Sequence, residues 1–196
     1  MSEFNAYDFF NELNKLNIPI RMDLGQVDVP PHPELIEVLK KEAHRLEYTS
    51  YKGVQELREK IAELHGVNIH EVIVIPGAKY GISAMICKAK HVGLIAPYWH
   101  GYMYAVKFFE KPYSVLETRL EDKWQPSFEL VNRKADTLII NYPNNPTGIM
   151  LTKDKIKELL DFVSERKIVL VSDEVYRDLT YLSLIHISEP TRPRLI

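Results

Sequence analysis

The sequence predicts an α/β fold with a mostly parallel sheet and flanking helices. Between residues 71 and 176, short runs rich in Val, Ile and Leu alternate with longer segments whose apolar residues recur at helical spacing. The short runs are apolar almost throughout, which is typical of strands that helices cover on both faces. Ligands of such sheets bind beyond the carboxyl ends of the strands, so the loops at 76–79, 141–148 and 172–176 are expected to form the functional edge.

Each element of this alternation is expected from a particular run of residues. The predicted strands cover residues 71–76, 92–96, 113–119, 136–143 and 167–176. The predicted helices cover residues 77–89 and 100–110, and a further helix carries Ile156, Leu159, Leu160 and Val163. The crossovers between parallel strands are expected to be right-handed.

Three helices are expected ahead of this alternation. An amphipathic helix is predicted over residues 4–16. A second helix begins at Pro33, because proline suits the first helical turn, and its apolar positions recur as far as Leu46. A third helix is predicted from Val54, and Gly66 is expected to end it.

Composition and charge argue against several classes of protein. The chain has 196 residues, of which 45% are apolar and 27% charged, as in a globular domain. A net charge of −2 leaves no basic excess for nucleic acid or an anionic membrane surface, and no apolar stretch is long enough to span a bilayer. The first residues lack a signal-peptide pattern, and the single cysteine, Cys87, is expected to be a buried, inert thiol. These features predict a cytoplasmic protein in a reducing compartment.

The stretch PGAKYG follows a predicted strand and opens a predicted helix. The backbone N–H groups of Gly77, Ala78 and Lys79 would then have no acceptor within the helix, and they would face an anion such as a phosphate. Many strand–helix turns contain a glycine, so an ordinary turn is the alternative interpretation.

The stretch NYPNNPTG places prolines and asparagines at the end of a predicted strand. Asn145 precedes Pro146, which disfavours the α-helical region for Asn145, and an Asn–Pro bond can also be cis. Such a turn would fix the direction of the Asn145 carboxamide. A solvent-exposed loop with ordinary turn chemistry is the alternative.

Two further loops supply a carboxylate and an aromatic ring. Asp173 directly follows apolar strand positions, so its carboxylate is expected to be partly desolvated and to need a cationic partner. Tyr176 lies three residues further on and could address the same ligand, although Asp173 could instead cap the next segment. Trp99 offers a flat face for a planar ring, whereas Tyr102 is expected only to pack.

Together these loops offer a phosphate site, a flat ring, a carboxylate for a ring cation and polar donors for a ring oxygen. Pyridoxal 5′-phosphate needs all four. A carboxylate beside its pyridine nitrogen keeps that nitrogen protonated, and the protonated ring acts as an electron sink. The combination therefore predicts pyridoxal 5′-phosphate as the cofactor.

The same motifs make the chain resemble the class I/II aminotransferases, the fold-type I pyridoxal-phosphate enzymes, and among them the aspartate and aromatic aminotransferase-like branch. The resemblance runs from about Leu24 to Tyr181, and it rests on LGQVDVPPHPEL, YTSYKGVQELR, PGAKYG, APYWHGY, NYPNNPTG and SDEVYRD in that order. It implies the large domain of an aspartate aminotransferase-like fold, in incomplete form.

The resemblance implies phosphate-binding and substrate-binding residues. Gly77, Ala78 and Lys79 match the family's phosphate loop. Tyr48 matches the tyrosine that reaches the cofactor phosphate of the neighbouring subunit, which implies a homodimer. Gly25 matches the glycine whose backbone lies near the substrate carboxylate.

The resemblance also implies residues that contact the cofactor ring. Trp99 matches the aromatic residue that stacks on the pyridine ring, and Asp173 matches the partner of the pyridine nitrogen. Asn145 and Tyr176 match the residues that hydrogen-bond the ring hydroxyl oxygen. No metal site is predicted.

The family's Schiff-base lysine lies downstream of the position of Asp173, and a substrate-binding arginine lies further on. No lysine follows Asp173 in this sequence, so no catalytic residue is assigned and the fragment is expected to be inactive. The stretch LSLIHISEPTR looks like a translated sequencing adapter, and a real strand over LSLIHI is the alternative. The chain is thus expected to comprise an N-terminal segment (1–40), a partial cofactor-binding domain (41–181) and an artefact tail (182–196).

The implied function of the intact protein is the transfer of an amino group from an α-amino acid to a 2-oxo acid. A pyridoxal-phosphate lyase of the same fold would use the same cofactor site and remains an alternative. A non-catalytic, aminotransferase-like ligand-binding domain is another, but such domains follow a DNA-binding module and no basic patch is present. A nucleotide-binding α/β module would need a G-x-G-x-x-G turn or a P-loop, and the sequence has neither.

Overall fold

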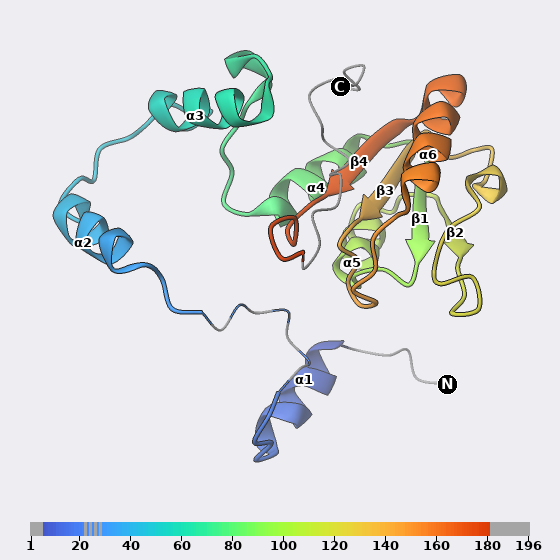
Figure 1. The fold of residues 1–196 in the computed structure, drawn as a ribbon, viewed down its shortest axis with the longest axis horizontal. Coiled ribbons are helices and arrows are strands. Elements are labelled where there is room, and N and C mark those ends of the chain that lie inside the picture. The colour runs from blue at the N-terminus through green and yellow to red at the C-terminus, as the bar shows by residue number, and fades with distance from the viewer. Residues whose placement is uncertain (1–5, 22, 24, 26, 28, 181–196) are drawn as a thin grey trace. The chain divides into compact units, whose positions relative to one another are not determined.

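The computed structural model describes residues 6–21, 23, 25, 27 and 29–180 (Figure 1). Its backbone divides into two compact units, which comprise residues 1–49 and 50–196, and each unit is described by itself. The predicted artefact tail, residues 182–196, lies outside the described residues. The predicted boundary after residue 40 stays a prediction.

The first unit contains helices α1 (Ala6–Lys15) and α2 (Pro33–Glu42), as the sequence predicts. Pro33 occupies the first turn of α2, and the His32 side chain accepts a hydrogen bond from the Glu34 N–H group. The helix ends at Glu42, so the prediction that it reaches Leu46 is wrong. Two lysines in its last turn suit the negative end of the helix dipole, but α2 buries none of its residues within this unit, so no packing extends it further.

The second unit begins with helix α3 (Gln55–His65) and a short 3₁₀ turn, η1 (Ile69–Glu71). Gly66 ends α3 as predicted, with a left-handed φ of 60°, and its N–H group donates to the last carbonyls of the helix. Asn68 and Glu71 form a capping box around η1. The Asn68 side chain accepts a hydrogen bond from His70 N–H, and the Glu71 side chain accepts one from Asn68 N–H.

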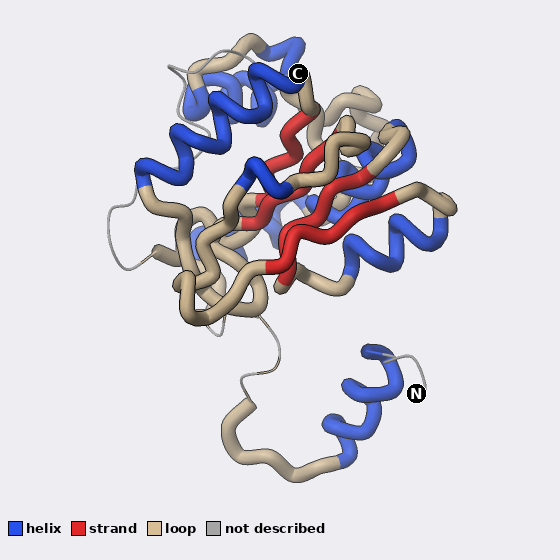
Figure 2. The backbone as a smooth tube through the Cα atoms, turned by 90° about the vertical axis from the view of Figure 1, so that its right-hand side faces the viewer, coloured by secondary structure: helices blue, strands red, loops and turns tan. Residues whose placement is uncertain are grey.

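Four parallel strands, drawn in red in Figure 2, form the sheet of the second unit. Their order is β2-β1-β3-β4, as labelled in Figure 1. The strands are β1 (Val92–Ala96), β2 (Tyr113–Glu117), β3 (Thr137–Asn141) and β4 (Val169–Asp173). The predicted parallel sheet is therefore confirmed, and each of these strands lies within a predicted one. In β1 and β3 the side chains are buried on both faces, as the continuous apolar runs indicate.

Helices cover both faces of this sheet. Helices α4 (Ala78–Lys88) and α5 (Gly101–Phe108) pack on one face, where they form a core with Val92, Leu94 and Ile139. Helix α6 (Lys153–Arg166) and the 3₁₀ turn η2 (Phe128–Leu130) pack on the other face against Leu138 and Ile140. Successive residues of a strand thus point to opposite cores, which is the three-layer arrangement expected for this class.

The predicted strand at residues 71–76 is absent from the described sheet. Val72 is buried, but Ile73 is 58% exposed and Ile75 36% exposed. Apart from local turn bonds at its two ends, the segment makes one backbone hydrogen bond among the described residues, from Val74 N–H to Lys52 O at 2.9 Å. An extended segment needs a row of partners on a neighbouring strand to form a ladder, and this segment has a single one among the described residues.

Cys87 also differs from its prediction. It lies near the end of α4, and its side chain is exposed rather than buried. The inward face of α4 is occupied by Ile82 and Ile86, and a cysteine directly after Ile86 points away from that face. Among the described residues, no helix is both long enough and apolar enough to cross a membrane.

Candidate active site

The order of the strands places a cavity at one edge of the sheet. The chain passes from β1 to β2 on one side and continues with β3 on the other side of β1. Loops that leave neighbouring strands in opposite directions open a crevice at their carboxyl ends. A cavity of about 300 Å³ lies in the second unit, between the ends of these strands and the start of α4. Its lining includes every site residue predicted for this unit: Gly77, Ala78, Lys79, Trp99, Asn145, Asp173 and Tyr176.

The N-terminus of α4 forms one wall of the cavity. Gly77 precedes the helix with a φ of 96°, which glycine adopts without steric cost. The Gly77 N–H group donates to Ile75 O at 2.8 Å, so the prediction that it is available to an anion is wrong. The N–H groups of Ala78 and Lys79 have no acceptor among the described residues. Two such donors at a helix N-terminus suit a phosphate.

Trp99 lines the cavity from the loop that follows β1. Its ring meets the ring of Tyr102 edge-on, with centroids 5.4 Å apart. Gly101 lies against the indole, because a Cβ atom at position 101 would come within 2.2 Å of the Trp99 ring. Any side chain at position 101 would displace the indole, a requirement that the sequence analysis did not identify.

Charge on this side of the cavity comes from Lys79. Burial, and then the charge of Lys79, hold the pKa of His100 below its usual value, so the imidazole is neutral at neutral pH. Lys79 itself is exposed at the start of α4. It therefore contributes a positive potential near the two free N–H groups, rather than a buried amine.

The loop after β3 is shaped by Asn144, the neighbour of the predicted Asn145. The Asn144 Oδ1 atom accepts hydrogen bonds from the N–H and hydroxyl groups of Thr147, at 3.1 and 2.7 Å. The Asn144 Nδ2 atom donates to Pro97 O at 3.2 Å, which ties this loop to the loop after β1. The peptide bond between Asn145 and Pro146 is cis. The loop is thus internally bonded and is not an ordinary solvent-exposed turn.

Asn145 and Tyr176 meet at the cavity. The Asn145 Nδ2 atom donates to the Tyr176 hydroxyl group at 3.5 Å. Both side chains line the cavity, one from the loop after β3 and one from the turn after β4. A ligand oxygen placed beside them would meet an amide donor and a phenol donor together.

Asp173 ends β4, and only 8% of its surface is exposed. Its Oδ2 atom accepts a hydrogen bond from the Tyr102 hydroxyl at 2.5 Å, and its Oδ1 atom accepts one from Val175 N–H at 3.2 Å. The second contact is that of a capping aspartate, so the alternative role is present alongside the position at the cavity. No cationic side chain among the described residues pairs with this carboxylate. The prediction that Tyr102 only packs is wrong.

A buried asparagine that the sequence analysis did not single out joins these two loops. The Asn141 Nδ2 atom donates to the Asp173 backbone oxygen at 2.9 Å, and its Oδ1 atom accepts from Asn145 N–H at 2.8 Å. Asn141 is 5% exposed and also lines the cavity. A polar residue at the end of an otherwise apolar strand was the available signal, because a buried amide needs partners.

Two predicted residues lie in the first unit. Gly25 is exposed, and the Tyr48 side chain is fully exposed. Their predicted contacts with the substrate and with the cofactor phosphate of a neighbouring subunit stay predictions.

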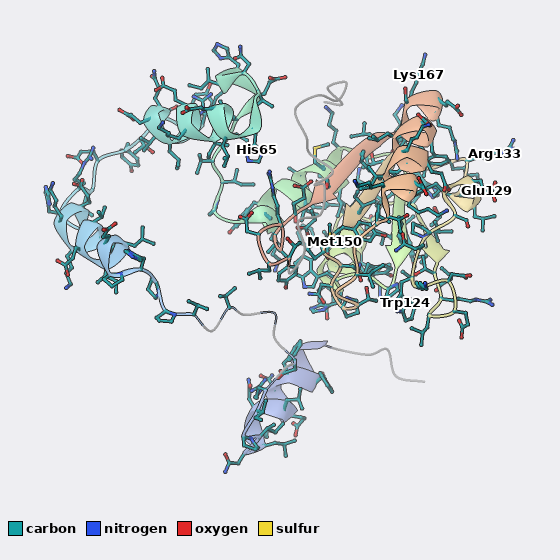
Figure 3. The ribbon with its side chains drawn as sticks, in the orientation of Figure 1. His65, Trp124, Glu129, Arg133, Met150 and Lys167 are labelled. Carbon is teal, nitrogen blue, oxygen red and sulfur yellow. The ribbon has the colours of Figure 1, made fainter. Side chains whose placement is uncertain are left out.

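A second hollow lies between η2 and α6, on the face of the sheet opposite to that covered by α4 and α5. Figure 3 labels two residues that line it, Glu129 and Arg133. The Arg166 guanidinium at this hollow stacks 5.0 Å from the Phe162 ring and donates to Val131 O at 3.1 Å. These contacts pack η2 against α6, so this hollow belongs to the scaffold.

The chain matches the family described as "Aminotransferase class I and II" over residues 18–195, a range that extends into the predicted artefact tail. The chain belongs to this family. An aspartate aminotransferase from Thermococcus kodakarensis is 44% identical over 180 residues, which cover 91% of this chain and 49% of that relative. The chain therefore spans about half the length of the curated relatives it matches.

Solved aminotransferases have the same fold. An aspartate aminotransferase from Thermotoga maritima superposes with a TM-score of 0.81 at 26% identity, covering 95% of this chain and 54% of that one. An aromatic aminotransferase from Pyrococcus horikoshii gives a TM-score of 0.78 at 28% identity, covering 95% of this chain and 54% of that one. The predicted fold class, part of an aspartate aminotransferase-like large domain, is confirmed.

Membership of the family implies pyridoxal phosphate as the cofactor. The cavity fits that molecule chemically. It offers free backbone donors for a phosphate, an indole face, a buried carboxylate without a cationic partner among the described residues, and an amide beside a phenol. These are the groups that a protonated, phosphorylated hydroxypyridine requires.

Proposed function

We propose that the protein to which this chain belongs is a pyridoxal-phosphate-dependent aminotransferase. It moves an amino group from an α-amino acid to a 2-oxo acid. The observation that carries this proposal is the cavity of about 300 Å³, in which seven side chains and backbone groups from four separate loops converge. The names of the relatives make aspartate the first amino donor to test.

Each wall of the cavity has a task in this proposal. The N–H groups of Ala78 and Lys79 bind the phosphate, and the positive end of the α4 dipole adds to their attraction. Trp99 covers one face of the ring and keeps water from it. When bound, the cofactor supplies an electron-withdrawing ring that stabilises negative charge on the carbon next to the amino group.

Asp173 holds a proton at the pyridine nitrogen. Its carboxylate is buried, and a buried carboxylate without a cation is costly, so it favours a ligand that brings a positive charge. Asn145 and Tyr176 orient the ring through its hydroxyl oxygen, because their polar atoms lie together at the cavity. Ile82 and Val175 complete the lining and keep the ring partly out of water.

The remaining catalytic groups are proposed to lie outside this sequence. The last lysine is Lys167, at the end of α6, and it does not line the cavity. The relatives are about twice as long as the matched region, and we place the lysine that bonds the cofactor in the part this chain does not share. Tyr48 is proposed to reach the phosphate of a second subunit, which makes the functional form a homodimer.

The first test needs no lysine, because pyridoxamine 5′-phosphate binds without a covalent bond. We expect the chain to bind it, and Asp173→Asn to bind it about tenfold or more weakly, since a neutral amide cannot pair with the ring cation. Titration calorimetry measures both affinities. A chain that fails to bind, or equal affinities for both variants, contradicts the assignment of this cavity.

A second test addresses the whole reaction. Sequencing the source gene beyond the codon for Tyr181 shows whether the reading frame continues to a lysine and a late arginine. The protein encoded by that frame is expected to release the 2-oxo acid derived from aspartate only when a second 2-oxo acid is supplied. Release of an elimination product without an acceptor would identify a lyase instead.

A further inference from the structure

The strongest unexplained contact at the cavity joins Tyr102 to Asp173. The Tyr102 hydroxyl donates to the Asp173 Oδ2 atom at 2.5 Å, although the two residues are 71 positions apart in the sequence. Tyr102 lies on α5 and is 1% exposed, so water cannot replace this donor. The task proposed for Asp173 does not by itself require such a partner.

Tyr102 is suited to be a permanent donor. Burial, and then the hydrogen bond and charge of Asp173, raise the pKa of the Tyr102 hydroxyl far above its usual value. The group is therefore protonated and neutral at neutral pH. A neutral phenol donates a hydrogen bond to the carboxylate and carries no negative charge that would repel it.

The remaining contacts of Asp173 fix its direction. The Oδ1 atom accepts from Val175 N–H, and the backbone oxygen accepts from the buried Asn141. With Oδ2 held by Tyr102, neither oxygen can turn without losing a hydrogen bond. Each carboxylate oxygen has more than one acceptor site, so the group can still accept a proton donor from the cavity that it lines.

We propose that Tyr102 is a positioning residue that keeps the Asp173 carboxylate aimed at the nitrogen of the bound pyridine ring, an inference that rests on the proposed function. Tyr102 does not line the cavity and acts through Asp173 alone. A carboxylate with two donors keeps its charge in a buried place at less cost than one with a single donor. The ring cation then meets a fixed negative charge instead of one that must first be oriented.

Packing is the competing explanation, because Tyr102 also belongs to the core between α4, α5 and the sheet. A packing role acts on every ligand of the cavity equally. The proposed role acts only on ligands that carry the ring nitrogen. The test therefore compares two probes: pyridoxamine 5′-phosphate, and an analogue in which a C–H group replaces the pyridine nitrogen.

We expect Tyr102→Phe to weaken pyridoxamine 5′-phosphate about tenfold, since one charge-assisted hydrogen bond supports the interaction, and to leave the affinity for the analogue unchanged. Tyr142→Phe is the matched control. It removes a second buried tyrosine hydroxyl, at 4% exposure, from the core on the opposite face of the sheet. This control is expected to change neither affinity.

Three outcomes overturn the proposal. Equal weakening of both probes would assign Tyr102 to packing, and unchanged affinity for both would leave it without a role at the ring. Weakening of the analogue alone would reverse the inference. Selective weakening of the nitrogen-containing probe supports it.

A ligand-free measurement separates this inference from the proposed function. If the unmodified chain binds neither probe, the proposed function fails, and the Tyr102–Asp173 contact is judged by urea unfolding of Tyr102→Phe, Asp173→Leu and the double variant. We expect the double variant to change the unfolding equilibrium at least about fivefold less than the product of the single changes, because the second substitution has no bond left to remove. Independent effects would overturn the positioning role.

Discussion

Segment 72–75 and strand β1 have similar apolar sequences but very different surroundings. Val92–Ala96 lies between two parallel neighbours, pairing with β2 along its whole length and with β3 from Val92 to Leu94. Segment 72–75 donates one backbone hydrogen bond to a distant part of the chain, from Val74 N–H to Lys52 O, and one local bond, from Val72 N–H to Ile69 O. One side chain supplies hydrogen bonds in place of a neighbouring strand. The buried Arg58 guanidinium donates to Val72 O at 2.9 Å and also to Ile69 O. An apolar run therefore becomes a strand only where neighbouring strands can pair with it.

Each of the two regions also has a glycine that allows a close approach, but of a different neighbouring group. Gly53 brings the backbone against segment 72–75, since a Cβ atom there would lie 2.6 Å from the Val74 Cβ atom. Gly101 instead admits the Trp99 indole beyond the end of β1. One glycine serves the packing of a segment and the other serves the cavity.

The largest expected difference is between apolar side chains in the two regions. Ile139, in the strand next to β1, is 2% exposed, whereas Ile73 is 58% exposed. Ile139→Ala should lower the free energy of unfolding by about 2–5 kcal/mol, because it leaves a cavity in the core. Ile73→Ala should change it by less than about 0.5 kcal/mol. Urea unfolding measures both, and comparable losses would mean that segment 72–75 is packed as tightly as the sheet.

The same contrast explains what the sequence could predict. The strands β1 and β3 follow from local runs, because their burial on both faces leaves an unbroken apolar pattern. Segment 72–75 carries the same pattern, but whether it pairs depends on which chain segments lie beside it. Local periodicity contains no information about that neighbour.

The residues of the cavity also fall into those that the sequence could predict and those that it could not. Asp173, Asn145 and Trp99 lie near or beyond the carboxyl ends of predicted strands. Because ligands of parallel sheets bind there, the sequence alone predicted that these residues share one site. Tyr102 and Asn141 were missed because their importance lies in long-range partners: Tyr102 bonds a residue 71 positions away and Asn141 one 32 positions away. Such contacts follow from the strand order, which the sequence pattern leaves open.

A smaller effect is expected where the chain leaves β1. Gly101→Ala should lower the free energy of unfolding by about 1–3 kcal/mol, because the new methyl group collides with the Trp99 indole. It should also weaken pyridoxamine 5′-phosphate, since the indole must move. Urea unfolding and calorimetry measure the two effects.

Removing the indole provides the control for that collision. In a Trp99→Leu background, Gly101→Ala should cost little or even stabilise, because alanine favours a helix start over glycine once the clash is gone. If Gly101→Ala costs the same in both backgrounds, the indole does not rest against Gly101, and the wall of the cavity is built differently.

The smallest expected effect concerns Arg58, whose side chain bonds backbone oxygens at segment 72–75. Arg58→Lys should cost about 1 kcal/mol, because an ammonium cannot reach both carbonyl oxygens that the guanidinium bonds. The change should be local: the Val74 amide should exchange its hydrogen faster, while the amides of β1 keep their protection. Hydrogen exchange followed by NMR resolves these amides individually. If β1 loses protection to the same extent, the two regions unfold as one cooperative unit, and Arg58 anchors the sheet as much as it anchors segment 72–75.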